Sequence, residues 1–131
     1  MSAANIVDSS GWIEYFADSP RAALFAPAIE DIENLLVPVL SIYEVFKKVL
    51  RERGETDAQQ VAQMMQLGQV LDLDCALAFE AARYPLPLAD SIIYASAVRH
   101  GATLWTQDEH FDGLPNVRYF PRPTPPPAST P

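Results

Sequence analysis

Residues 88–106 read LADSIIYASAVRHGATLWT, and the fold depends on what this stretch requires. From Leu88 to His100 almost every position is apolar or small, which predicts a helix that is packed on nearly all sides. Gly101 is placed to end this helix, because glycine readily adopts the left-handed conformation that closes helices. Residues 102–105 then form an apolar run of strand length. A buried helix that leads directly into a buried strand indicates an α/β protein.

Short apolar runs and helical patterns alternate along the rest of the chain. Besides the strand at 102–105, the sequence predicts strands at 5–7, 35–40, 70–73 and 116–120. The spacing of apolar residues predicts helices near 12–16, 21–34, 42–53, 56–67, 74–83 and 88–100, and Pro27 marks a kink or break in the second of these. This alternation favours a three-layer α/β sandwich, in which a central, mainly parallel sheet is flanked by helices.

The segment Ser41-Ile42-Tyr43-Glu44 has the form of a capping box, in which the serine caps a helix and the glutamate bonds back to it. Apolar residues then recur with helical spacing up to Arg53, and Gly54 follows as a stop signal. We therefore expect Ser41 to cap a helix that spans about 42–53.

One domain accounts for most of the chain. With 131 residues, of which 49% are hydrophobic, the sequence is long enough for one core and too short for two ordinary domains. We assign residues 1–120 to this domain. Residues 121–131 are rich in proline, cannot build a core, and are expected to form an extended, mobile tail.

The sequence also predicts where the protein is located. No segment approaches the ~20 consecutive apolar residues that a membrane span requires. The amino-terminal residues carry neither the basic region nor the apolar run of a signal peptide. Cys75 is the one cysteine, so no disulfide can form within the chain. We therefore expect a cytoplasmic protein that has no membrane partner.

The net charge of −8 argues against a protein that coats nucleic acid through positive potential. A small basic cluster exists at Lys47, Lys48, Arg51 and Arg53, and a solvated helix face explains it best. If nucleic acid is the substrate, another source of positive charge is needed.

Four carboxylates lie where predicted apolar segments begin or end: Asp8, Glu44, Asp90 and Asp108. Ligands of parallel sheets bind outside the carboxyl ends of the strands, so these residues are the first candidates for chemistry. Each one taken alone also has a structural explanation, as a helix cap or a turn residue. Glu44 could equally close the capping box or pair with Lys48.

The four carboxylates are harder to explain structurally as a set. Asp90 opens an apolar helix, so its side chain is expected to point inward, where an unpaired charge is costly. Neighbouring carboxylates repel one another, and such a cluster either takes up protons or holds a cation. Ligands that are all oxygen favour Mg²⁺ or Mn²⁺ over zinc. A bound ion of this kind would also supply the positive charge that attracts a scissile phosphate.

Four segments, taken in order, resemble the PIN domain, especially the small VapC-type toxins. They are Ile6-Val7-Asp8-Ser9-Ser10, Ser41-Ile42-Tyr43-Glu44-Val45, Pro87-Leu88-Ala89-Asp90-Ser91-Ile92-Ile93-Tyr94-Ala95 and Thr106-Gln107-Asp108-Glu109-His110-Phe111. No segment is specific alone, but their order and spacing resemble that family over residues 5–120.

This resemblance implies an Mg²⁺- or Mn²⁺-dependent ribonuclease, the toxin of a type II toxin–antitoxin pair, with residues 1–120 as its nuclease domain. It implies catalytic roles for Asp8, Glu44, Asp90 and Asp108, metal binding by Asp8, Asp90 and Asp108, and supporting hydrogen bonds from Ser9 and Thr106. It further implies a homodimer and a small VapB-like antitoxin that blocks the acidic pocket.

Other functions are compatible with the same residues. The carboxylates would equally serve a metal-dependent phosphodiesterase acting on DNA or on a small phosphoester, and a non-catalytic PIN-like module would use them to grip a basic partner. A phospho-accepting receiver domain ranks low, because it needs a late lysine and none follows Lys48. Among the neighbours, His110 is expected to lie on a surface loop and Asp112 in a turn with Gly113.

Overall fold

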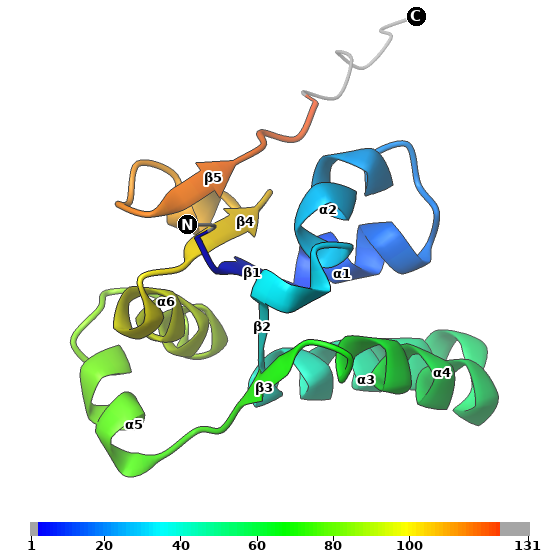
Figure 1. Ribbon diagram of the computed structural model, residues 1–131, viewed down its shortest axis with the longest axis horizontal. Helices are drawn as coiled ribbons and strands as arrows, with labels where there is room; N and C mark the ends of the chain where they lie inside the picture. The colour runs from blue at the N-terminus through cyan, green and yellow to red at the C-terminus, as the bar shows by residue number, and fades with distance from the viewer. Residues whose placement is uncertain (1–2, 124–131) are drawn as a thin grey trace, which may run out of the picture.

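The computed structural model describes residues 3–123, which form a parallel sheet between two layers of helices (Figure 1). The sheet has five strands in the order β3-β2-β1-β4-β5, and all the strand pairs are parallel. The strands are β1 (Asn5–Val7), β2 (Leu35–Pro38), β3 (Gln69–Leu71), β4 (Thr103–Thr106) and β5 (Val117–Tyr119). The expected three-layer α/β sandwich is confirmed.

Helices cover both faces of the sheet. One face packs against α1 (Ser9–Phe16), α2 (Ala22–Ile29), α3 (Val39–Arg53) and α4 (Glu55–Met65). The other face packs against α6 (Leu88–His100), which in turn packs against α5 (Cys75–Ala81). Two short 3-10 turns, η1 (Ile32–Asn34) and η2 (Glu109–Phe111), complete the described elements.

The central strand β1 shows why its sequence is apolar at successive positions. Ile6 and Val7 are both fully buried, and they belong to the cores on opposite faces of the sheet. Side chains alternate between the two faces of a strand, so a strand covered on both sides needs apolar residues throughout. Asp8 is the first polar residue after this strand and is therefore carried to the edge of both cores.

The start of α3 differs from the prediction. The strand expected at 35–40 ends at Pro38, and the helix begins at Val39 rather than after Ser41. Proline has no N–H for a strand ladder, and its fixed φ suits the residue before a helix. Ser41 thus lies inside the first turn, fully buried, and its Oγ has no hydrogen-bond partner among the described residues. The predicted capping box is therefore wrong.

Other boundaries lie close to those expected. The helix α6 spans the predicted residues 88–100 and ends at Gly101, whose φ of 60° is left-handed. The helix predicted over residues 21–34 is interrupted after Ile29. Pro27, where a kink or break was expected, lies inside α2.

Arg21, at the start of α2, holds the end of the domain. Its guanidinium donates hydrogen bonds to the carbonyl oxygens of Phe120 (3.0 Å) and Pro121 (3.3 Å). Most of the predicted tail, residues 124–131, lies outside the described residues. Within the described part of the chain, no helix combines the length and apolar character needed to cross a membrane.

Candidate active site

The candidate site lies at the carboxyl ends of three neighbouring strands. Asp8 follows β1 directly, Asp108 lies two residues after β4, and Glu44 is in α3, the helix that follows β2. The order β2-β1-β4 places these strand ends side by side. The chain leaves β1 toward one neighbour and returns later on its other side, and such a reversal opens a crevice at the edge of the sheet.

Asp8 is fixed in one orientation by its surroundings. The carboxylate is 4% exposed and caps α1, with Oδ1 accepting from the Gly11 backbone N–H at 3.0 Å. Ser10 Oγ donates to both carboxylate oxygens at 2.9 and 3.0 Å, and Thr106 Oγ1 donates to Oδ2 at 2.7 Å. Thr106 comes from β4, so this last bond joins two strand ends.

The close approach of α1 requires glycine at position 11. A Cβ there would lie 2.7 Å from side-chain atoms of Phe25 and Val7, which is shorter than real contacts allow. The glycine lets the first turn of α1 settle against β1, so that its N–H reaches Asp8.

Thr106 links Asp8 to Asp108. While its hydroxyl donates to Asp8, its Oγ1 accepts a hydrogen bond from the Asp108 backbone N–H at 2.9 Å. Thr106 is fully buried, and its bond to Asp8 is buried with it, while its bond from the Asp108 N–H is partly buried. The two aspartates are therefore held at a fixed separation by one side chain.

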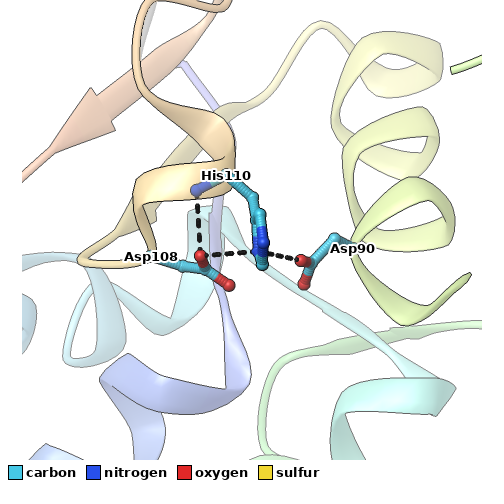
Figure 2. A group of neighbouring side chains, drawn as sticks. All are labelled: Asp90, Asp108 and His110. Carbon is cyan, nitrogen blue, oxygen red and sulfur yellow. Dashed lines mark hydrogen bonds and ion pairs between the residues drawn. The ribbon is translucent and has the colours of Figure 1, made fainter. Parts of the chain in front are cut away.

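Asp90, Asp108 and His110 form a cluster whose ligand atoms all lie within 4.8 Å of one another (Figure 2). His110 Nδ1 lies 3.0 Å from Asp90 Oδ2 and 2.9 Å from Asp108 Oδ1. Asp108 also caps η2, where its Oδ1 accepts from the His110 backbone N–H at 2.9 Å. The imidazole thus lies between a carboxylate from α6 and one from the loop after β4.

The electrostatics show that the three aspartates share one environment. Burial raises the pKa of Asp8 to about 6, against the hydrogen bonds from Thr106, Gly11 and Ser10, and the charge of Asp108 adds to the increase. Burial also raises the pKa of Asp90 to about 6, with further increases from Asp108 and Asp8 and an opposing effect of His110. The hydrogen bond to Asp108 and its charge raise the pKa of His110.

Glu44 reaches the same edge of the sheet through Ser9, whose Oγ donates to Glu44 Oε1 at 2.6 Å. Ser9 directly follows Asp8, so this bond joins the first turn of α1 to the second turn of α3. The glutamate is half-buried and makes this contact instead of closing a capping box.

The structure brings Asp8, Asp90 and Asp108 together and places Glu44 beside them through Ser9. Asp8 is not a member of the tight cluster, in which His110 takes the third place among the described residues. His110 and Ser10 were missed from sequence. The spacing Asp108-x-His110 was a usable signal, because an aspartate that caps a short turn brings the residue two positions later back toward itself. Asp112 is exposed and outside the cluster.

The donor atoms fit a hard divalent cation. Oxygen ligands come from carboxylates whose ionised forms are destabilised by burial and by one another, and a cation would relieve this destabilisation. The imidazole of His110 adds a nitrogen donor that Mn²⁺ accepts more readily than Mg²⁺ does.

A doubly wound parallel sheet with clustered aspartates at its switch point belongs to a class of α/β proteins suited to metal-assisted hydrolysis of phosphate esters. Within that class, the PIN domain family model matches residues 6–116. The match covers most of the chain, which therefore belongs to the PIN domain family, a family of nucleic-acid hydrolases.

Solved structures share the whole fold. A toxin–antitoxin complex from Klebsiella pneumoniae matches with a TM-score of 0.74 and 21% identity, over 88% of this chain and 96% of the other. DNA-bound VapBC from Salmonella typhimurium matches with a TM-score of 0.70 and 14% identity, over 91% and 98%. VapC20 of Mycobacterium tuberculosis, a sarcin-ricin loop cleaving toxin, matches with 0.67 and 18%, over 88% and 99%. A search of curated protein sequences finds no match.

Proposed function

We propose that this protein is an Mg²⁺- or Mn²⁺-dependent endoribonuclease and the toxin of a type II toxin–antitoxin pair. The observation that carries the proposal is the meeting of Asp8, Asp90 and Asp108, which are separated along the chain; in the fold the charge of Asp108 helps to raise the pKa of both Asp8 and Asp90. Burying mutually repelling carboxylates without a bound cation would only weaken the protein. Their cost is explained if they hold a metal ion for catalysis.

The proposed metal ligands are Asp8, Asp90 and Asp108, with Glu44 completing the catalytic carboxylates. A bound Mg²⁺ would polarise the scissile phosphate and lower the pKa of an attacking water. The protein's own contribution is orientation: Thr106 fixes Asp8 relative to Asp108, and Ser9 fixes Glu44.

A positive metal centre also accounts for nucleic-acid chemistry in a chain of net charge −8. Phosphate binding usually relies on clustered lysine and arginine. The cluster of Lys47, Lys48, Arg51 and Arg53 on α3 is best explained as a solvated helix face. The same negative charge suits a basic segment of a small VapB-like antitoxin. The solved toxin–antitoxin complexes of the same fold support such a partner, and we extend the proposal to a cytoplasmic homodimer.

The experiment uses purified protein, Mn²⁺ and single-stranded RNA. Wild type is expected to cut the RNA, and Asp8→Asn and Asp90→Asn are each expected to abolish cutting, because each removes one ligand charge at almost unchanged volume. Circular dichroism and thermal unfolding should show that both variants remain folded. Cutting at the same rate by wild type and both variants would show that another protein or another site is responsible.

Two further substrates separate the alternatives. A DNA oligonucleotide of the same sequence, and an RNA with a single 2′-deoxy sugar at the cleaved position, report whether the enzyme requires ribose. Cutting of DNA as fast as RNA would favour the general phosphodiesterase. Tight metal binding without cutting of either polymer would favour the non-catalytic module. Sequencing of RNA ends after a brief pulse of expression would name the target.

A further inference from the structure

A second feature adjoins the aspartate cluster: an open cavity of about 450 Å³ on the side of β4 and β5. It is lined by Ser10 of α1, residues 107–110, Tyr119 of β5 and Arg122. Its volume lies within the ~300–1,000 Å³ of pockets that hold small ligands. Asp108 and His110 belong both to this cavity and to the cluster, so a group bound in the cavity would touch the candidate active site.

Gln107 presents a fixed hydrogen-bond donor to this cavity. Its side chain is 4% exposed, and its Oε1 accepts from Arg21 Nε at 2.6 Å. Arginine can only donate, so the amide oxygen must face Arg21 and the amide nitrogen must face away from it. Among residues 3–123 no acceptor is found for that nitrogen, although the residue lines the cavity. The Gln107 amide nitrogen is not among the buried polar atoms without a partner, so it is accessible from the open cavity, and a donor held in place by Arg21 there is suited to an acceptor on a ligand.

Tyr119 and Arg122 add two features that a nucleotide requires. The Tyr119 ring is half-buried in the cavity wall and offers an aromatic surface for a base. Arg122 is exposed at the rim, where its guanidinium can pair with a phosphate. Arg118, by contrast, is stacked over Trp105 with its Cζ 4.4 Å from the ring centroid, and the strand alternation sends it to the opposite face from Tyr119.

The charges around the cavity limit how a nucleotide can lie. Asp108 and Glu109 also line it and would repel a phosphate, so the phosphate must lie toward Arg122. The Gln107 amide would then donate to a carbonyl or ring nitrogen of the base, or to a sugar oxygen. Since the chain is strongly acidic overall, these local donors are needed to hold one nucleotide in place.

We propose that this cavity binds the nucleotide of a single-stranded RNA that neighbours the cleaved phosphodiester, with Gln107 donating to it, Tyr119 stacking on its base and Arg122 pairing with its phosphate. The inference rests on the proposed ribonuclease function, which it extends to a substrate subsite and three residues that determine binding and specificity.

The test measures the Kd of a labelled, mixed-sequence single-stranded RNA by fluorescence anisotropy, with Ca²⁺ in place of Mn²⁺ so that the carboxylates still have a cation, under conditions in which wild type is first shown to leave the RNA uncut. Gln107→Glu keeps the size of the side chain and its bond to Arg21 but replaces the donor by an acceptor, and should weaken binding about tenfold. Tyr119→Leu should weaken it by about fivefold or more, whereas Tyr119→Phe keeps the stacking surface and should stay near wild type.

Arg122→Gln is tested through salt dependence, which a purely structural role would not change. Loss of one phosphate contact on a single strand should reduce the slope of log Kd against log salt by about 0.7. Arg53→Gln, which makes the same change of charge at the exposed end of α3, should leave the slope as in wild type. Thermal unfolding of each variant establishes that it is folded.

The inference is overturned if Gln107→Glu, Tyr119→Leu and Arg122→Gln all bind RNA with the affinity and salt slope of wild type. If Gln107→Glu or Tyr119→Leu fails to fold, the exposed Arg122 still decides the result. Weakened binding by the variants, together with no cutting by wild type in Mn²⁺, would reject the ribonuclease assignment and leave the RNA subsite intact. Cutting by wild type in Mn²⁺, together with unchanged RNA binding by the variants, would reject the RNA subsite and leave the ribonuclease assignment intact.

Discussion

Asp8 and Asp108 are held in opposite ways, although one threonine joins them. Asp8 is almost fully buried at the end of the central strand, and its oxygens are bonded by groups from α1 and β4. Asp108 has 28% of its side chain exposed and is held by the short turn η2 and by His110. The comparison teaches that one half of the site is positioned by the core and the other by a local turn.

The largest effect is expected where the two halves meet. Thr106→Val keeps the shape of the side chain but removes the bond to Asp8 and the acceptor of the Asp108 N–H. Asp8 keeps its bonds from Gly11 and Ser10, but it loses the bond from Thr106 and the Asp108 N–H loses its acceptor, which should lower the free energy of unfolding by about 1–3 kcal/mol. Misplacement of the two aspartates should lower RNA cleavage by about tenfold or more.

Thr106→Ser is the matched control, because it retains the hydroxyl. It should recover most of the cleavage rate while losing some stability through the missing methyl group. If Thr106→Val cuts RNA at the wild-type rate, the two halves of the site do not depend on this link.

The second effect is the dependence of the protein's stability on pH, to which the carboxylates of Asp8 and Asp90 contribute. The pKa of Asp8 and of Asp90 is about 6 in the folded protein, above the value of 3.8 for an ordinary aspartate. Between about pH 4 and pH 6 the folded protein therefore holds more protons than the unfolded chain. For metal-free protein, the contribution of these two groups to stability should increase as the pH falls through about 6, and be lost as it rises.

Chemical denaturation of wild type and Asp8→Asn in chelator, at pH 5 and pH 7, measures this effect. The variant should gain stability relative to wild type at the higher pH, where Asp8 is charged, and lose that advantage at the lower. Saturating Mg²⁺ should reverse the trend for wild type, since metal ligands must be deprotonated. A stability difference between the two proteins that does not change with pH would contradict the raised pKa of Asp8.

The smallest effect is expected in the exposed half. His110→Gln removes the imidazole that lies between Asp90 and Asp108, but the side chain is 52% exposed and water can replace its contacts. Unfolding should change little, and Mn²⁺ binding, followed by calorimetry, should be retained. Asp108→Asn is the comparison and should lose that binding. Complete loss of Mn²⁺ binding in His110→Gln would instead make the histidine an essential ligand.

Most of the fold was predictable because its signals are local. Gly101 ends α6 where a left-handed residue is needed, and the neighbouring apolar residues Ile6 and Val7 predicted a strand, which the structure buries on both faces. The start of α3 was not predictable in the same way. Ser41 and Glu44 have the spacing of a capping box, but Pro38 ends the strand earlier and moves the helix start toward the amino terminus.

The candidate site was predictable to the extent that it depends on strand ends. Asp8 and Asp108 follow apolar runs that were predicted to be strands of a mainly parallel sheet, and the carboxyl ends of parallel strands lie at one edge of a sheet. His110 could not be placed in this way, because its contact with Asp90 arises from the turn after Asp108 and from the packing of α6. The role of Gln107 could not be predicted for a similar reason, since its hydrogen-bond partner Arg21 lies 86 positions away in the sequence.

The middle position of β1 has a consequence for synthesis of the protein. The strand β1 leaves the ribosome before both of its neighbours in the sheet, which are β2 on one side and β4, at residues 103–106, on the other. The hydrogen bond from Thr106 to Asp8 and the contact of His110 with Asp90 can therefore form only after residues 106 and 110 have been translated. A polypeptide that stops before β4 lacks Thr106, Asp108 and His110, so the candidate site can form only after these residues have been translated.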